Sequence, residues 1–98
     1  MNVLIVGGGI GGLTAALCLA RRGNKVSVFE QSPVFGEVGA GLQLSPNCTR
    51  VLHDLGLEQS ILRSAFLPEG TQFRQWDNGK VIGESMLGAS AVARYGYP

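Results

Sequence analysis

The stretch Val3-Leu-Ile-Val-Gly7-Gly-Gly9-Ile-Gly-Gly12 decides the fold of this 98-residue chain. A short apolar run rich in β-branched residues leads into the pattern Gly-x-Gly-x-x-Gly, and a helical pattern follows it. A second apolar run, Lys25–Glu30, ends in an acid. Strand, glycine turn, helix and strand in this order are typical of the unit that binds the ADP half of a dinucleotide. The sequence therefore predicts an α/β fold that opens with a Rossmann-like βαβ unit.

Each residue type in this motif has a chemical reason. Gly7 allows a sharp turn out of the first strand, and the missing side chain at Gly9 lets the backbone approach a pyrophosphate. Gly12 lets the helix pack close to the strand. The free N–H groups and the positive end of the helix would hold the phosphates, and Glu30 would accept hydrogen bonds from the ribose hydroxyls. A glycine-rich turn that binds no ligand is the alternative that these residues leave open.

The composition excludes several classes of protein. Ninety-eight residues form at most one small domain, and contents of 45% hydrophobic and 15% charged residues are typical of a globular chain. The net charge is +1 and the basic residues are scattered, so we expect no nucleic-acid partner. The two cysteines lack metal-ligand spacing, so we expect no metal and a cytoplasmic chain with free thiols. No membrane span is expected, because five glycines interrupt the apolar run Val3–Ala20.

The sequence predicts further elements in chain order. The first helix is expected over Gly11–Arg22. Ser45 is typical of an N-cap, Pro46 suits the first helical position, and the second helix should end at Gly56. A short helix, two hairpin strands and their turn follow, over Glu58–Ala65, Thr71–Trp76, Lys80–Glu84 and Asp77–Gly79. The tail, Leu87–Pro98, shows no clear periodicity.

Three segments resemble one known family, the class A flavoprotein aromatic hydroxylases, which include salicylate hydroxylase and p-hydroxybenzoate hydroxylase. The segment Val6–Ala16 resembles the FAD-binding glycine motif of that family. Val28-Phe-Glu30 resembles its ribose-binding strand end, with Gln31 where a basic residue often follows the acid. Gly36–Leu57 resembles the stretch that runs beside the flavin. The resemblance covers about residues 1–57, and the hairpin beyond is compatible with it.

The resemblance implies the N-terminal FAD-binding portion of an NAD(P)H-dependent monooxygenase that hydroxylates an aromatic small molecule. It implies no catalytic residue within this chain. The cofactor-binding residues that it implies are Gly7, Gly9, Ile10, Gly11, Gly12, Glu30, Gln31, Ala40, Gly41 and Gln43. The expected organisation is a glycine motif and βαβ unit over residues 1–30, a flavin-side loop and helix over 31–65, and a hairpin over 71–84.

The chain also departs from the family, whose members are several times longer and carry a later FAD motif and a substrate domain. We therefore expect a chain that is incomplete relative to the family and inactive alone. We also expect homo-oligomers, because the first strand would present an unpaired edge. Two other functions stay open, an NAD-binding module of a dehydrogenase and a non-catalytic chain that self-associates.

Five other side chains are of types that can serve a functional site. Arg50 could contact a phosphate or a flavin carbonyl, or be a solvated arginine. His53 is expected to be an ordinary helical residue, because no acid or nucleophile has motif spacing to it. Phe73, Trp76 and Tyr95 are expected to pack the hairpin rather than face a substrate.

Overall fold

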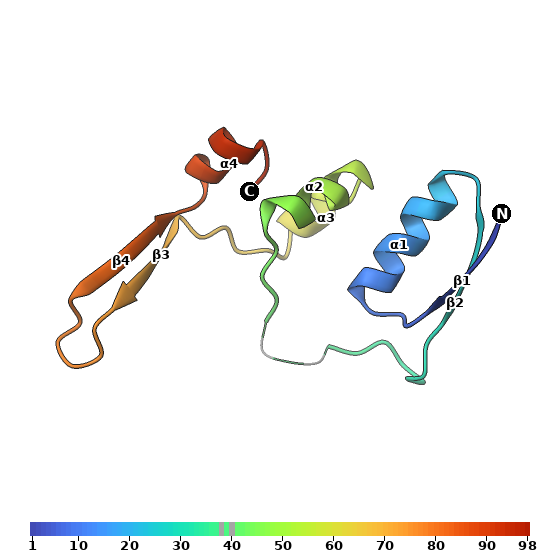
Figure 1. Ribbon diagram of the computed structural model, residues 1–98, viewed down its shortest axis with the longest axis horizontal. Helices are drawn as coiled ribbons and strands as arrows, with labels where there is room; N and C mark the ends of the chain where they lie inside the picture. Colours follow the sequence, from blue (N-terminus) through green and yellow to red (C-terminus); the bar gives the residue numbers. More distant parts are fainter. Residues whose placement is uncertain (38, 40) are drawn as a thin grey trace. The chain divides into compact units, whose positions relative to one another are not determined.

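The computed structural model describes residues 1–37, 39 and 41–98, and the chain divides into two units, residues 1–42 and 43–98. The first unit contains β1 (Asn2–Val6), α1 (Ile10–Arg21) and β2 (Lys25–Phe29) (Figure 1). The second contains α2 (Pro46–Asp54), α3 (Glu58–Leu62), β3 (Gly70–Arg74), β4 (Val81–Met86) and α4 (Ala89–Tyr95). The predicted α/β class, with a βαβ unit followed by helices and a hairpin, is confirmed.

The first unit is a parallel pair of strands connected by a helix. Asn2 lies opposite Lys25, and Val6 lies opposite Phe29. Half-buried and exposed residues alternate along both strands, because successive side chains of a strand point to opposite faces. The half-buried face packs under α1, and Ile5 lies on it close to Gly12. On the other face Val6 is 90% exposed.

The helix α1 begins one residue earlier and ends one residue earlier than predicted. Gly9 is its N-cap and Arg22 its C-cap. The N–H of Gly23 donates to the carbonyl of Ala20 at 2.9 Å, and Gly23 has a φ of +81°. Glycine adopts this left-handed conformation without steric cost, which is why the helix stops here.

In the second unit, α2 begins at Pro46 with Ser45 as its N-cap, at the predicted positions. The Ser45 hydroxyl makes no capping hydrogen bond, however, and donates instead to the side-chain oxygen of Asn47. The strands β3 and β4 pair antiparallel, with Gly70 opposite Met86, and their turn contains Gly79 at a φ of +70°. The predicted hairpin is therefore present, with strand bounds shifted by one or two residues.

The tail forms a helix that its aperiodic sequence did not predict. α4 is flanked by Gly88 and Gly96, which have φ values of +56° and +81°. The tail beyond it contacts α2, where the buried Thr49 hydroxyl donates to the carbonyl of Pro98 at 2.8 Å. The rings of His53 and Tyr97 meet edge to face with centroids 5.3 Å apart. Tertiary contacts of this kind stabilise a short helix that local sequence alone does not favour.

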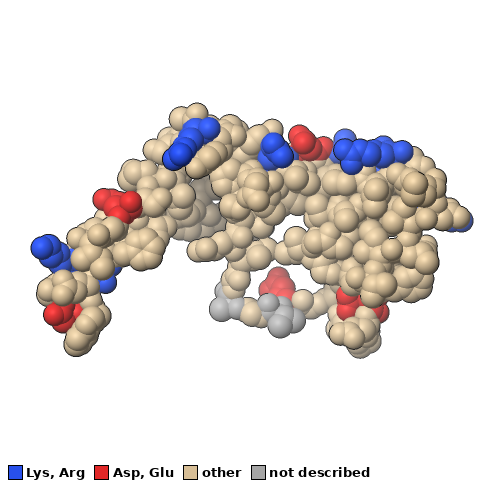
Figure 2. All heavy atoms as spheres, viewed as in Figure 1, with Lys and Arg blue, Asp and Glu red and all other residues tan. Residues whose placement is uncertain are grey.

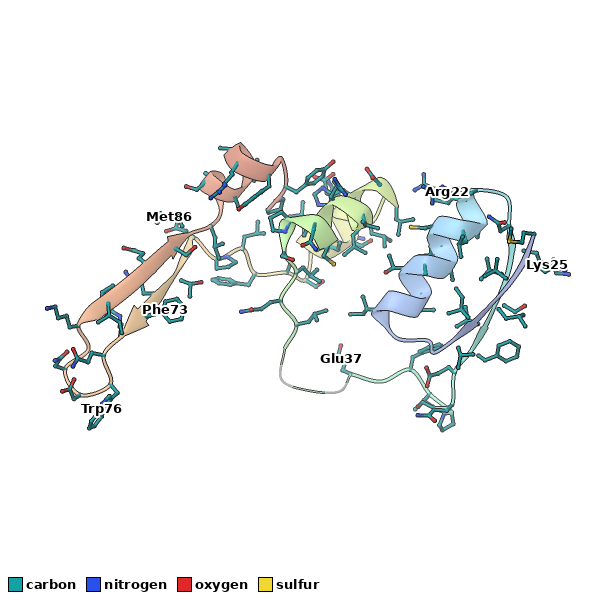
Figure 3. All side chains as sticks on the ribbon, in the orientation of Figure 1. Arg22, Lys25, Glu37, Phe73, Trp76 and Met86 are labelled. Carbon is teal, nitrogen blue, oxygen red and sulfur yellow. The ribbon has the colours of Figure 1, made fainter. Side chains whose placement is uncertain are left out.

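The prediction that Trp76 packs the hairpin is wrong, whereas the ring of Phe73 lies against the opposite strand, with its Cδ2 3.5 Å from where a Cβ atom of Gly83 would be. Figure 3 shows Trp76 at the turn of the hairpin, where it is 94% exposed, and Phe73 on β3, which is exposed throughout. The physical reason is that two strands alone cannot enclose a large ring, and within the described residues few side chains cover either face.

The described residues also bear on the expectations about a membrane span, a metal site, the two cysteines and a nucleic-acid surface. None of their helices is long and apolar enough to cross a membrane. They contain no group of three or more His, Cys, Asp or Glu that could hold a metal ion. Cys18 and Cys48 are free thiols. The face drawn in Figure 2 carries scattered charged side chains and no broad basic area.

Candidate functional site

The glycine motif, Gly7–Gly12, connects β1 to α1 and forms the first part of the candidate site. Gly7 has a φ of +107°, a conformation that glycine adopts readily. Its N–H donates to the carbonyl of Phe29 at 2.7 Å. The chain therefore turns sharply out of β1 while it is still hydrogen-bonded to the end of β2.

Gly12 brings the helix close to the turn. A Cβ atom at this position would lie 2.0 Å from the carbonyl oxygen of Gly7 and 3.5 Å from Cγ2 of Ile5. Because real Cβ atoms do not approach a backbone oxygen so closely, no side chain fits here without a shift of the backbone. The beginning of α1 thus lies directly against the carboxyl end of β1.

Gly9 and Gly11 are glycines for a different reason. Neither has a positive φ, and a Cβ atom at either position would meet no described atom within 4 Å. Glycine in a helix costs roughly 0.5–1 kcal/mol relative to alanine. At Gly11, which lies inside α1, no packing contact in the described part of the chain offsets that cost. The open space beside both residues is where a ligand can approach the backbone.

Among the described residues, no side chain caps the start of α1 by a hydrogen bond. The N-cap Gly9 has no side chain, and the first turn contains no acid. The first hydrogen bond of the helix joins the N–H of Leu13 to the carbonyl of Gly9 at 2.9 Å. The N–H groups of Ile10, Gly11 and Gly12 precede Leu13, the first intrahelical donor, and therefore have no acceptor within the helix. An exposed, uncapped helix start of this kind suits a phosphate group.

Glu30 follows β2 directly and places a carboxylate beside the glycine motif. Its Oε1 accepts a hydrogen bond from the N–H of Ser32 at 2.8 Å, and its Oε2 accepts one from the N–H of Gly8 at 2.6 Å. These two bonds, with a weaker contribution from the N–H of Gln31, lower the pKa of Glu30 below its ordinary value. The side chain is exposed, so a charged acceptor faces solvent at this edge of the site.

Gly8 and Phe35 are residues of this site that the sequence reasoning missed. Gly8 is buried although Gly9 beside it is exposed. A Cβ atom at Gly8 would lie 3.0 Å from Cε1 of Phe35 and 3.1 Å from Cβ of Glu30. The run of three glycines at residues 7–9 was a signal for close contact at Gly8, whereas no local pattern indicated Phe35.

The residues expected on the flavin side are not brought to the glycine motif by any described contact. Gln31 has an exposed side chain, and Gly41 is exposed as well. Ala40 lies outside the described residues, and Gln43 belongs to the second unit. Contact of these residues with a flavin therefore stays a prediction.

Arg50 and His53 lie in the second unit. Arg50 lines an open pocket of about 200 Å³ with Pro46, Asn47 and Tyr95. His53 is half-buried against Tyr97. Neither arrangement combines an acid, a base and a nucleophile, so the described geometry assigns no catalytic role to them.

Comparison with known proteins identifies the family. The pattern of the FAD binding domain family matches residues 1–96, which is nearly the entire chain. The chain belongs to this family. Membership of the FAD binding domain family favours a flavin nucleotide over the NAD of a dehydrogenase module.

Curated relatives in this family are aromatic monooxygenases, which confirms the predicted resemblance. The chain is 45% identical over 97 residues to 3-amino-4-hydroxybenzoate 2-monooxygenase of Streptomyces platensis, covering 99% of this chain and 24% of the relative. It is 41% identical over 98 residues to 3-hydroxybenzoate 6-hydroxylase of Polaromonas naphthalenivorans, covering 100% and 24%. It is 34% identical over 95 residues to 6-hydroxynicotinate 3-monooxygenase of Bordetella bronchiseptica, covering 97% and 25%. The chain thus spans about a quarter of the length of these relatives.

Proposed function

We propose that this chain binds FAD through the ADP half of the cofactor, as the N-terminal portion of an FAD-binding domain. The observation that carries the proposal is the open space at Gly9 and Gly11 in front of an uncapped helix start. In the described structure no packing contact requires glycine at either position, and Gly11 carries the cost of a glycine within the helix. A pyrophosphate against the backbone accounts for that choice.

The residues of the first unit fit the chemistry of this cofactor. The N–H groups at the start of α1, from Gly9 to Gly12, would donate hydrogen bonds to the phosphates, and Gly7 would shape the turn that presents them. The ionised carboxylate of Glu30 would accept hydrogen bonds from the ribose hydroxyls. Gln31, directly after Glu30, is proposed to lie at the ribose-binding strand end, and Ala40, Gly41 and Gln43 near the flavin ring or its ribityl chain. When bound, FAD supplies the redox chemistry of an NAD(P)H-dependent monooxygenase.

The names of these relatives suggest a class of substrate for an enzyme that contains this portion. They name aromatic or heteroaromatic carboxylates that carry a hydroxyl group. We propose a substrate of that class for an enzyme that contains this portion, and no hydroxylation by the 98 residues alone. Substrate-dependent oxidation of NAD(P)H by the purified chain, coupled to formation of a hydroxylated product, would contradict the second proposal.

A substitution at Gly9 tests the proposed FAD binding. We expect Gly9→Val to abolish binding of ADP and FAD in calorimetric titrations, because its branched side chain fills the space where the pyrophosphate approaches. Ala20→Val is the matched control, since Ala20 is exposed near the other end of α1. Circular dichroism of both variants reports whether the fold is kept.

Two results of these titrations would overturn the proposal. Undiminished affinity of Gly9→Val for ADP would mean that the glycine motif is a turn without a ligand. Tighter binding of NAD than of FAD to the unsubstituted chain would favour the dehydrogenase module instead.

We also propose that the chain assembles into homo-oligomers. In the described structure β1 pairs with β2 alone, so its other edge has no strand beside it. On the sheet face away from α1, Leu4, Val6 and Phe29 are exposed. An open strand edge beside apolar side chains favours pairing with a second copy.

A further inference from the structure

We infer that Glu30 is a positioning residue, whose carboxylate holds the glycine motif in shape before any ribose binds. The inference rests on the two backbone hydrogen bonds of this side chain. Oε2 accepts from the N–H of Gly8 at 2.6 Å, across the two ends of the neighbouring strands. Oε1 accepts from the N–H of Ser32 at 2.8 Å, within the chain that leaves β2. The carboxylate thus joins the turn after β1 to the turn after β2.

This positioning role leaves Glu30 free to serve a ribose as well. A carboxylate oxygen can accept two hydrogen bonds, so each oxygen of Glu30 retains one acceptor position after its bond to the backbone. A glutamine could not replace it fully, because one of its two terminal atoms is a donor. The ionised carboxylate can therefore hold both N–H groups and still accept hydrogen bonds from ribose hydroxyls.

Phe35 completes the enclosure of Gly8. The Ser32 hydroxyl donates to the carbonyl of Val34 at 2.7 Å, which folds the chain back after β2. Cε1 of Phe35 then lies 3.0 Å from where a Cβ atom of Gly8 would be. Gly8 is therefore held by a carboxylate on its N–H and by a ring beside its Cα. A side chain at this position would have to push Phe35 or Glu30 aside by a few tenths of an ångström, so the enclosure favours glycine at Gly8.

Removal of the Glu30 side chain should affect the binding of pyrophosphate, which has no ribose, in opposite directions depending on its role. One role is to position the glycine motif, and the other is only to bind the ribose. This step rests on the proposed binding of phosphates at the glycine motif. The charge of Glu30 repels a nearby phosphate, so removing a side chain that serves only the ribose leaves pyrophosphate binding unchanged or makes it stronger. Removing a side chain that shapes the motif makes pyrophosphate binding weaker despite the lost repulsion.

Amide hydrogen exchange measured by NMR tests the positioning role without any ligand. The N–H of Gly7 is the internal reference, because its bond to the carbonyl of Phe29 does not involve the Glu30 side chain. In Glu30→Ala we expect exchange at Gly8 to accelerate about tenfold relative to Gly7, the size expected for loss of a charge-assisted hydrogen bond. Glu37→Ala, which removes an exposed acid from the following loop (Figure 3), should leave the ratio unchanged.

The exchange experiment remains decisive if the alanine variant unfolds. Glu30→Gln keeps one acceptor oxygen, so we expect it to fold and to raise the ratio of Gly8 to Gly7 exchange by a smaller factor. An unchanged ratio in the folded Glu30 variants would overturn the inference.

Titration with inorganic pyrophosphate provides the second measurement. We expect Glu30→Ala to bind pyrophosphate roughly three- to tenfold more weakly than the unsubstituted chain, and Glu37→Ala to bind it equally well. Equal or tighter binding by Glu30→Ala would overturn the inference. Failure of the unsubstituted chain to bind pyrophosphate would count against the proposed function instead, and the exchange ratio would still decide the role of Glu30.

Discussion

Replacing Gly12 with alanine should destabilise the chain, although alanine is the better helix former. The added Cβ atom would lie 2.0 Å from the carbonyl oxygen of Gly7. Contacts below 3.0 Å are essentially absent at real Cβ atoms, so α1 and the turn must separate by about 1 Å. Overpacking of this kind costs about 1–3 kcal/mol, which exceeds the gain of roughly 0.5–1 kcal/mol from replacing a helical glycine. We expect the free energy of unfolding to fall by about 1–2 kcal/mol.

Gly11→Ala is the matched control, because the same substitution at the neighbouring helical position meets open space. A Cβ atom at Gly11 would have no described atom within 4 Å, and the residue has no positive φ. The free energy of unfolding should rise by about 0.4–1 kcal/mol, since alanine has fewer unfolded conformations to lose. Affinity for ADP should fall in this variant, because its methyl group stands where a phosphate approaches.

Urea denaturation followed by circular dichroism measures both changes under identical conditions. We expect the free energy of unfolding to be lower for Gly12→Ala than for the unsubstituted chain, and higher for Gly11→Ala. A Gly12→Ala variant at least as stable as the unsubstituted chain would refute the close contact between α1 and Gly7. An unstable Gly11→Ala variant would show that Gly11 packs against structure, and the case for a ligand there would fail.

The remaining predictions concern ligand choice, pH and assembly. ADP should bind more tightly than 2′-phospho-ADP, because the ionised carboxylate of Glu30 repels a phosphate at the ribose 2′ position; a calorimetric preference for the phosphorylated ligand would contradict this. The hydrogen bonds from Ser32 and Gly8 lower the pKa of Glu30 in the folded chain. Its contribution to stability is therefore fully present above the pKa that Glu30 has in the unfolded chain. That contribution is lost as the pH falls through the lower pKa of the folded chain. Carboxyl NMR shifts of Glu30 should therefore titrate at a lower pH in the folded chain than in urea, and equal midpoints would count against the two bonds. Light scattering with intact-mass measurement should show a homo-oligomer, whereas a stable monomer at working concentration would rule out assembly through β1.

The βαβ unit could be predicted from the sequence because its signals are local. The apolar alternation in β1 and β2, the glycine turn and the end of α1 at Gly23 each depend on residues that are close in the chain. The hairpin was predictable for the same reason, since Gly79 adopts the positive φ that its turn requires. Local chemistry therefore fixed these elements to within one or two residues.

The features that could not be predicted depend on contacts between distant residues. The helix α4 has no clear periodicity of its own, and the tail that follows it reaches α2 through the hydrogen bond from Thr49 to Pro98. The packing of Phe35 against Gly8 joins residues from separate turns, and no spacing rule anticipates it. At Ser45 the N-cap position could be predicted from the sequence. The hydrogen bond from its hydroxyl to the side-chain oxygen of Asn47, in place of a capping bond, could not.

The glycines of the motif separate into two physical classes that the sequence pattern alone does not distinguish. The fold favours glycine at Gly7 through a positive φ, at Gly12 through a contact with the backbone, and at Gly8 through tight contacts with the side chains of Phe35 and Glu30. Gly9 and Gly11 are required by no described contact, and both lie beside the uncapped start of α1. Selection for folding alone would favour alanine at Gly11, because a helical glycine costs stability, and serine or aspartate at the N-cap Gly9, because their side chains cap a helix better. The two unconstrained glycines, rather than the complete motif, are therefore the structural argument that a phosphate group approaches this backbone.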